Sequence, residues 1–365
     1  MTSQGNFPPP PEPILVFDWE GTLMQIFPDE KGPMSEWKTV AAIDRAAATL
    51  ESLGLKYHLI LATNTSESNA SQVRAALKRV GLDGYITEIF NFQEPGCRKP
   101  EPQFFYSIAE VLQVPPARLV MIGDDLQADI SGAKGCGWRA AWYNPGFLPA
   151  TNLHPQHDIE IHHLPELINA LREPALPDIA ACQQIFLQQK LPLNLLEHVN
   201  RVAGAAYLLA LALCQAGIKV NPILAHRGGL LHDLARPLAH QLQVNGQGYH
   251  DHGELAFQIL QSLGYPALAE IALTHPLDTI ITDTRCPVTW EQKIVYYADK
   301  LVDGDRLVPI EDRLSSLARR YPEITSNLPE YQQALITLQT QICAAAGLSP
   351  TALLEKIRYL STGKL

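Results

Sequence analysis

The sequence predicts a chain of two domains, an α/β domain followed by an all-α domain. Between residues 14 and 172, short apolar runs alternate with amphipathic helical patterns, which is typical of a doubly wound parallel sheet. From residue 179 onward, only helical patterns follow one another. The length of 365 residues and the apolar fraction of 46% are sufficient for two packed cores.

Proline-rich stretches mark the expected limits of the domains. The prolines within residues 1–13 predict a loose arm ahead of the α/β domain, which we place at residues 14–172. Residues 173–178, which read Glu-Pro-Ala-Leu-Pro-Asp, predict a linker to the all-α domain at residues 179–365.

The composition favours a cytoplasmic protein that binds neither membranes nor nucleic acids. The formal net charge of −10 argues against tight binding along nucleic-acid backbones, although small phosphorylated substrates held through metals stay possible. The six cysteines form no CxxC pair, which indicates reduced cysteines. The apolar stretch Val202–Cys214 is shorter than a bilayer span and rich in alanine, so we expect a buried core helix there.

Apolar runs and helical patterns place the elements of the first domain in order. A strand at residues 14–17 precedes a helix over 37–53, and a strand at 57–62 precedes a helix over 66–80. Further strands are expected at residues 85–90, 118–122, 138–143 and 158–161, with a last helix at 164–171.

Polar side chains follow three of these strands. They are Asp18 and Glu20, then Thr63, then Asp124 and Asp125 with Asp129 four residues later. Because open α/β sheets bind ligands beyond the carboxyl ends of their strands, we expect one shared site, which Lys99 joins from a proline-fixed loop. Acids facing a lysine and a hydroxyl suit phosphoryl transfer with Mg²⁺. Taken alone, Asp18 and Glu20 fit an acidic surface turn equally well.

The order of these motifs resembles the haloacid dehalogenase (HAD) superfamily of phosphatases over residues 14–172. The resemblance implies a Rossmann-like fold in which Asp18 is the nucleophile that forms an aspartyl-phosphate and Glu20 is the general acid and base. It also implies that Thr63 binds phosphoryl oxygens and that Lys99 balances charge. The implied Mg²⁺ ligands are Asp18, Glu20 and Asp124, with Asp125 or Asp129. We further expect Asn64 and Arg98, the neighbours of Thr63 and Lys99, to contact substrate.

Two features depart from the pattern of many HAD phosphatases. Glu20 stands where these phosphatases usually carry aspartate, and a displacement of about 1 Å can cost on the order of 100-fold in rate. We therefore expect this domain to be slow, altered in specificity or catalytically retired. The intervals 23–62 and 64–98 are too short for a large cap, so we expect minimal or no cap and a site that is open or covered by another part of the chain.

Chemistry in the second domain is expected from polar residues spread over apolar helices. The helices are predicted at residues 192–214, 222–236, 252–263, 266–275 and 291–302, and residues 314–365 add two or more. An adjacent His-Asp pair between leucines is costly unless both side chains find partners, and divalent Fe, Mn, Zn or Ni supplies them. The candidate ligands are His198, His232, Asp233, His252, His275 and Asp299.

This set of residues resembles the HD phosphohydrolase superfamily over residues 185–310. The resemblance implies that His198, His232, Asp233 and Asp299 hold one metal, and that His252 and His275 hold a second, with Asp233 as the bridge. The histidine set is most similar to bacterial HD-domain diadenosine tetraphosphate hydrolases. His250 competes with His252 for one place, and we prefer His252 because an apolar pattern follows it at helical spacing.

Two other groups of residues have competing interpretations. Lys300, Arg306 and Arg313 are candidates to receive substrate phosphates, although a solvated helix face explains them at least as well. The histidines before the linker lack the spacing of a closed zinc site and are expected to form a solvated edge. They are His154, His157, His162 and His163.

The leading hypothesis is a bifunctional metal-dependent phosphohydrolase that cleaves phosphoric ester or phosphoanhydride bonds in small, nucleotide-like substrates. The second domain would open a nucleotide, dinucleotide polyphosphate or phosphodiester, and the first would remove the remaining monoester. A second hypothesis keeps only the HD domain active, with the first domain as a scaffold or phosphate sensor. A third is a nucleotide-binding regulatory protein without turnover. The sequence leaves the substrates, the metals of the second site and the oligomeric state open.

Overall fold

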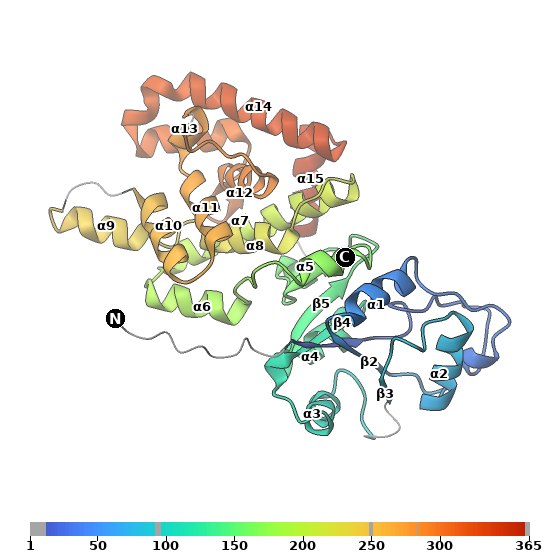
Figure 1. The fold of residues 1–365 in the computed structure, drawn as a ribbon. Coiled ribbons are helices and arrows are strands. Elements are labelled where there is room, and N and C mark those ends of the chain that lie inside the picture. Colours follow the sequence, from blue (N-terminus) through green and yellow to red (C-terminus); the bar gives the residue numbers. More distant parts are fainter. Residues whose placement is uncertain (1–11, 92–95, 248–250, 283, 362–365) are drawn as a thin grey trace. The chain divides into compact units, whose positions relative to one another are not determined.

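The computed structural model describes residues 12–91, 96–247, 251–282 and 284–361. It divides into two compact units, an α/β unit and a largely helical unit (Figure 1). The α/β unit ends at residue 173, but residues 147–155, which we expected inside the first domain, group with the helical unit instead. Most of the predicted proline-rich arm at residues 1–13 lies outside the described residues.

The α/β unit is built on a parallel sheet that has six strands within the described residues, in the order β3-β2-β1-β4-β5-β6. Leu15 and Phe17 of β1 pack in an apolar cluster with helices α1, α2 and α5, and the alternate residues Ile14 and Val16 are buried as well. Burial of both faces explains the continuous apolar runs and confirms the doubly wound fold. The strands are β1 Ile14–Phe17, β2 His58–Thr63, β3 Glu88–Asn91, β4 Leu119–Gly123, β5 Arg139–Tyr143 and β6 Ile159–Ile161.

The first helix of this unit is shorter than predicted. The pattern over 37–53 indicated one helix, but α1 begins only at Ala46, directly after Arg45 in a left-handed conformation with φ of 58°. The Arg79 guanidinium donates hydrogen bonds to the carbonyls of Ser35 (3.0 Å) and Trp37 (2.6 Å), which holds the preceding segment as an irregular loop. The helices and short turns are η1 Met34–Glu36, α1 Ala46–Gly54, α2 Ala70–Arg79, α3 Pro102–Val111, η2 Pro116–Arg118, η3 Leu126–Ser131, α4 Gly132–Gly135 and α5 Glu166–Ala170.

Two of the histidines expected on a solvated edge are buried, so that prediction is wrong for them. His157 and His162 are 0% and 5% exposed. The Nε2 atom of His157 lies 3.0 Å from Glu160 Oε2, and Nδ1 of His162 donates to the carbonyl of Asn144 at 2.7 Å. Each of these rings therefore has a protein partner for one of its nitrogens, whereas His163 is exposed as expected.

The helical unit is organised around the long helix α7, whose residues from Val202 to Leu213 are buried. This confirms the expected core helix, and no helix in the described part of the chain is long and apolar enough to cross a membrane. All six cysteines lie in described residues and none forms a disulfide. The elements are η4 Thr151–Leu153, α6 Ile179–Gln188, α7 Leu193–Gln215, α8 Pro222–Leu231, α9 Arg236–Val244, α10 His252–Ser262, α11 Pro266–Thr274, η5 Leu277–Ile281, α12 Trp290–Lys300, β7 Val302–Asp303, β8 Arg306–Leu307, α13 Ile310–Arg320, η6 Pro322–Asn327, α14 Leu328–Ala346 and α15 Pro350–Ser361.

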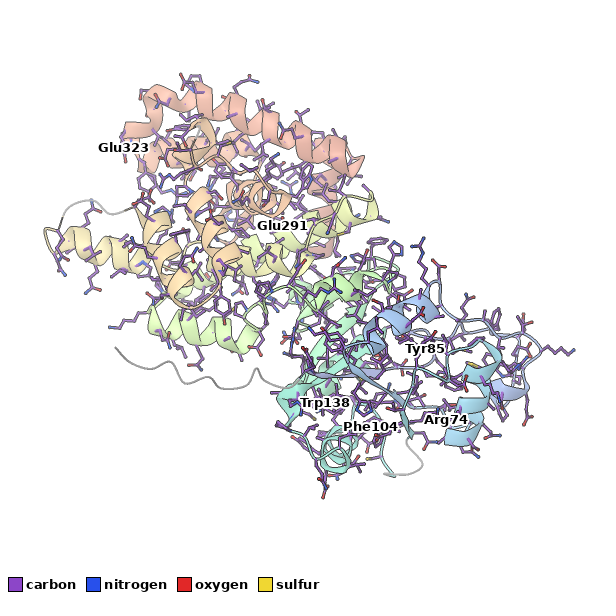
Figure 2. The ribbon with its side chains drawn as sticks, viewed as in Figure 1. Arg74, Tyr85, Phe104, Trp138, Glu291 and Glu323 are labelled. Atoms are coloured by element: carbon purple, nitrogen blue, oxygen red, sulfur yellow. The ribbon has the colours of Figure 1, made fainter. Side chains whose placement is uncertain are left out.

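The helix predicted over residues 222–236 is interrupted. Helix α8 ends at Leu231, His232 and Asp233 lie in a turn, and α9 begins at Arg236. Pro237 has no N–H group to continue the hydrogen-bond ladder, which explains the break. Glu291, labelled in Figure 2, lies in the first turn of α12 and accepts a hydrogen bond from the backbone N–H of Asn221, the N-cap of α8, at 2.8 Å.

Candidate active sites

The first acidic cluster lies where β1 and β4 end. Asp18 follows β1, and its backbone N–H donates to the carbonyl of Ile122 in β4 at 2.8 Å, while Asp124 follows β4. The strand order changes direction between these two strands, and such switch points are where open α/β sheets bind ligands. One carboxylate oxygen from each of Asp18, Asp124 and Asp129 lies within 4.8 Å of the others, so these three residues suit one oxygen-ligated cation.

Two glycines allow the carboxylates to approach this closely. Gly21 has φ of +82°, and a Cβ atom there would lie 2.5 Å from Oδ2 of Asp124. A Cβ atom on Gly123 would lie 2.1 Å from Oδ2 of Asp129. Both distances are far below a van der Waals contact, so the cluster depends on glycine at both positions.

Lys99 is the buried cation of this site. It is 3% exposed, and its ammonium donates to Asp18 Oδ1 (2.5 Å), Asp129 Oδ1 (2.6 Å) and the carbonyl of Ala62 (2.9 Å). Burial alone would lower the pKa of Lys99, but the carboxylates of Asp129 and Asp18 raise it above its ordinary value. Burial, with the nearby Asp18 charge, raises the pKa of Asp129 to about 7, against the opposing effect of Lys99. The lysine thus neutralises carboxylates that would otherwise repel one another.

The structure distinguishes between Asp125 and Asp129 as the third carboxylate. Asp125 Oδ1 accepts hydrogen bonds from the backbone N–H groups of Gln127 and Ala128, both at 2.8 Å, so this side chain caps the turn η3. Asp129 instead points into the cluster. The side chain of Glu20 is not part of the three-carboxylate cluster. Burial, followed by the charge of Asp18, raises the pKa of Glu20, which favours a carboxyl group that can carry a proton.

The other predicted residues of this site have different surroundings. Thr63 is buried, and its Oγ1 accepts a hydrogen bond from the N–H of Thr65 at 3.1 Å. The Asn64 amide holds the backbone of Lys99 from both sides, at 2.9 Å and 2.8 Å, so its evident role is to position that lysine. Arg98 is exposed and lies 4.0 Å from Glu101. Substrate contacts of Asn64 and Arg98 stay predictions.

Sequence reasoning missed two residues that orient Asp124. The hydroxyl of Thr22 donates to Asp124 Oδ1 at 2.8 Å, and the indole N–H of Trp142 donates to the Asp124 carbonyl at 2.9 Å. Thr22 belongs to the Gly-Thr turn after β1, so the motif contained a signal for it. Trp142 lies on β5, which is adjacent to β4 in the sheet, and only the strand order identifies it.

The helical unit gathers all six residues predicted as metal ligands. Asp233 lies at the centre, with Oδ2 facing Nε2 of His232 at 3.5 Å and of His198 at 4.0 Å. Its other oxygen, Oδ1, faces Nε2 of His275 at 3.1 Å and of His252 at 3.4 Å. Asp233 therefore has the geometry of a carboxylate that bridges two subsites.

Asp299 completes the first of these subsites. Its Oδ1 atom lies 3.0 Å from Nε2 of His198 and 3.7 Å from Nε2 of His232. We call His198, His232, Asp233 and Asp299 the first subsite, and Asp233, His252 and His275 the second. His250, the alternative to His252, lies outside the described residues.

Backbone carbonyls fix the orientation of three histidine rings. Nδ1 of His198, His232 and His275 lies 3.2, 2.8 and 2.6 Å from the carbonyls of Gly304, Gly229 and Ala272, respectively. Because a carbonyl only accepts, Nδ1 carries the proton and Nε2 presents a lone pair to the site.

The histidine nitrogens fit a metal better than they fit one another. Nε2 of His252 and Nε2 of His275 are 3.0 Å apart, and Nε2 of His232 is buried without a hydrogen-bond partner among the described residues. Burial, followed by His275, lowers the pKa of His252 to about 3, and burial also lowers the pKa of His275. Neutral rings whose lone pairs converge on a carboxylate are suited to divalent transition metals.

Three cationic side chains, those of Arg236, Lys300 and Arg313, lie within 4.0 Å of a ligand carboxylate, and of these only Arg236 is substantially exposed. Arg236, which sequence reasoning missed, places Nε 3.2 Å from Asp233 Oδ1 with 40% of its side chain exposed. Lys300 is 4% exposed, contacts Asp299 and donates to the carbonyl of His275 at 3.0 Å. The expectation of a solvated helix face is therefore wrong for Lys300, whereas its contact with substrate phosphates stays a prediction. Arg306 is exposed on β8, and Nη2 of Arg313 lies 3.9 Å from Asp299 Oδ1.

Comparisons with known proteins find family matches in both units of the chain. A family model described as HAD-hydrolase-like matches residues 96–167, and a model described as HD domain matches residues 195–315. An uncharacterized protein of Methanocaldococcus jannaschii is 34% identical over 139 residues, which cover 35% of this chain and 77% of that protein. A glyceraldehyde 3-phosphate phosphatase of Pyrococcus furiosus is 30% identical over 26% of this chain, which spans only 40% of that relative.

Solved structures also match part of the chain. An uncharacterized protein from Listeria monocytogenes is 25% identical and covers 44% of this chain and 98% of its own, with a TM-score of 0.38. On the evidence of the two family models and the phosphatase relative, this chain belongs to the HAD-like hydrolases through its N-terminal domain, carries an HD domain after it, and is a hydrolase that acts on phosphoric esters.

Proposed function

We propose that the chain is a bifunctional, metal-dependent phosphohydrolase with one working site in each unit. The observation that carries this proposal is the completeness of both sites. The α/β unit brings together three carboxylates and Lys99, and the helical unit brings together four histidines around the bridging Asp233. A domain kept only as a scaffold would have no need for buried, mutually repelling ligands.

In the first site, Asp18 attacks the phosphorus of a monoester and forms an aspartyl-phosphate while the ester oxygen leaves. Mg²⁺ held by Asp18, Asp124 and Asp129 would neutralise charge on the phosphoryl group. Glu20, whose pKa is raised by burial, gives its proton to the leaving oxygen and then takes one from the water that hydrolyses the aspartyl-phosphate. Lys99 holds Asp18 in position, and Thr63 supplies a hydroxyl donor to the phosphoryl oxygens.

In the second site, Asp233 and the four histidines would hold two divalent transition metals. Such a pair can stabilise both the attacking and the leaving oxygen of a phosphoryl displacement. The half-exposed Arg236 is placed to bind a substrate phosphate beside Asp233, because its guanidinium reaches both solvent and the site. A cation-rich centre of this kind suits nucleotides, dinucleotide polyphosphates or phosphodiesters.

The joining of the two domains supports sequential action, in which the helical unit releases a monoester that the α/β unit hydrolyses. The test is phosphate release from nucleotides, dinucleotide polyphosphates and sugar phosphates by wild type, Asp18→Asn and Asp233→Asn, first with Mg²⁺ and then with Mn²⁺. We expect each variant to lose a different substrate class. The sequential model is wrong if the product of neither domain is a substrate of the other.

One observation favours a second candidate function, in which the α/β unit senses phosphate without efficient turnover. Glu20 carries a longer side chain than the expected aspartate and lies outside the carboxylate cluster. Glu20→Asp separates the two possibilities. A large gain in monoesterase activity would favour a retired or slowed domain, whereas a loss would show that the site is built for glutamate.

A further inference from the structure

The short β7–β8 hairpin takes part in the metal centre through its backbone. It follows α12, which carries Asp299, and its two strands pair Val302 with Leu307 and Asp303 with Arg306. The carbonyl of Gly304 at its tip accepts a hydrogen bond from Nδ1 of His198 at 3.2 Å. This contact keeps the proton on Nδ1 and leaves Nε2 of His198 to face Asp299 and Asp233.

The β7–β8 hairpin is too short to be stable without contacts from neighbouring helices. Its strands have two residues each, and isolated two-stranded hairpins are marginally stable at best. Three arginines from two helices hold it: Arg201 Nε donates to the Asp305 carbonyl at 3.2 Å, while Arg313 and Arg320 donate to Asp303 Oδ1 at 2.7 and 2.5 Å.

Arg313 differs from the other two arginines in its surroundings. Its side chain is 5% exposed, compared with 48% for Arg320. Its Nη1 faces Asp303, its Nη2 lies 3.9 Å from Asp299 Oδ1, and its buried Nε has no hydrogen-bond partner among the described residues. A buried guanidinium is costly without such partners, so the link to Asp303 is the contact that a change at Arg313 would disturb most.

We propose that Arg313 is a positioning residue of the first subsite. The hydrogen bond from Arg313 to Asp303 holds the β7–β8 hairpin in place, and the hairpin in turn positions the Gly304 carbonyl. That carbonyl holds His198 in the tautomer that can ligate a metal. The proposal rests on the metal-dependent function proposed for the helical unit, and it adds one residue that determines how well the first subsite forms.

If Arg313 acted only through its charge, its removal would change metal affinity in the opposite direction. A guanidinium 3.9 Å from Asp299 Oδ1 repels a cation bound at that oxygen, so its removal would tighten metal binding. Loss of a positioning contact instead weakens metal binding, typically by about 10- to 100-fold when the lost group holds a metal ligand in place. The direction of the change therefore separates the two roles.

The test is calorimetric titration of metal-free full-length protein with Mn²⁺, comparing wild type, Arg313→Met, Asp303→Ala and the double variant. We expect the single variants to weaken one binding step about 10- to 100-fold, and the double variant to weaken it no further. The step assigned to Asp233, His252 and His275 should stay within about twofold. Arg319→Met, which removes an exposed charge from the same helix, is the matched control and should bind Mn²⁺ with the affinity of wild type.

Histidine side-chain ¹⁵N NMR of the metal-free protein adds a readout that requires neither metal nor turnover. Wild type should show His198 protonated at Nδ1, and Arg313→Met, measured well below its own melting temperature, should show a mixture of tautomers. Mn²⁺ binding by Arg313→Met that equals or exceeds that of wild type, or an equal loss at the two binding steps of the helical unit, would overturn the proposal. Failure of wild type to bind Mn²⁺ would instead contradict the proposed function of the helical unit.

Discussion

The two candidate sites are assembled in different ways. In the α/β unit, Asp18 and Asp124 follow neighbouring strands, and glycines at positions 21 and 123 let the carboxylates come together. In the helical unit, the ligands come from five separate segments, and carbonyls orient three of the histidine rings. The first site offers carboxylate oxygens alone and suits Mg²⁺, while the second mixes imidazole with carboxylate and suits transition metals.

Each site also contains a buried lysine, but the two lysines have different neighbours. Lys99 donates to two of the three clustered carboxylates, Asp18 and Asp129. Lys300 contacts one ligand, Asp299, and the backbone carbonyl of another, His275. Lys99 therefore neutralises carboxylates that a bound cation would also neutralise. Lys300 instead contacts the ligands Asp299 and His275 and helps to orient them. The comparison shows that a buried lysine can balance the charge of clustered carboxylates, as Lys99 does, or fix the positions of metal-ligand candidates, as Lys300 does.

The largest expected effect comes from the residue shared by both subsites of the helical unit. Asp233→Ala should remove both bound metals and lower hydrolysis by that unit on the order of 1,000-fold or more, because both subsites lose their bridge. His252→Ala should remove only one. Metal content after dialysis, measured by mass spectrometry, checks this, and Asp124→Ala should leave the helical unit's metals in place. Equal losses in Asp233→Ala and His252→Ala would argue against a bridge.

The buried lysines give the next comparison. Lys99→Met leaves Asp18 and Asp129 without their counter-charge, and breaking a buried ion pair typically costs about 3–5 kcal/mol. Mg²⁺ should restore part of this loss, because it neutralises the same carboxylates. Lys300→Met should gain no stability from Mg²⁺. Urea unfolding with and without Mg²⁺ measures both variants, and a Lys99→Met protein that gains no more from Mg²⁺ than wild type would contradict this account.

The sequence predicted the α/β fold well because its signals are local. The apolar run Ile14–Phe17 followed by Asp18 specifies a buried strand and its end, and β1 has these bounds. The helix expected over residues 37–53 failed because Arg79, far away in the chain, holds the segment before Ala46 as a loop. The helix predicted over residues 222–236 was also too long, because the apolar pattern continues through the turn at His232 and Asp233, and the signal for the break is Pro237 just beyond it.

The ligand candidates could be predicted because polar residues in apolar helices are conspicuous. Their supporting residues could not, because support depends on spatial neighbours. Trp142 reaches Asp124 from an adjacent strand, and Gly304 reaches His198 from a hairpin more than a hundred residues later in the chain. Lys300 shows the same limit, since its sequence position allowed either a phosphate contact or a solvated helix face, and its burial against Asp299 depends on packing that the sequence pattern does not contain.

A smaller effect should follow from the glycine dependence of the first site. Gly123→Ala places a methyl group 2.1 Å from Asp129 Oδ2, so we expect a loss of about 1–3 kcal/mol and weaker Mg²⁺ binding. Gly135→Ala is the matched control, because a Cβ there meets nothing within 4 Å and α4 should tolerate alanine. Urea midpoints of the two variants check this. The comparison of the sites would need revision if Gly123→Ala were as stable as Gly135→Ala.

The smallest expected effect concerns the pH dependence of the hairpin that supports the second site. Burial alone would raise the pKa of Asp303, but Ser316, Arg313 and Arg320 together hold it below its ordinary value. A carboxyl group with a lowered pKa stabilises the fold above its unfolded pKa, about 3.9, and this contribution disappears as the pH falls through the folded pKa. The difference in melting temperature between wild type and Asp303→Asn should therefore be largest above pH 5 and shrink toward pH 3. In an Arg313→Met background, this difference in melting temperature should be smaller at every pH, because one of the cations that lower the pKa of Asp303 is absent. A difference in melting temperature that depends on neither pH nor background would show that these arginines do not hold Asp303 as an anion.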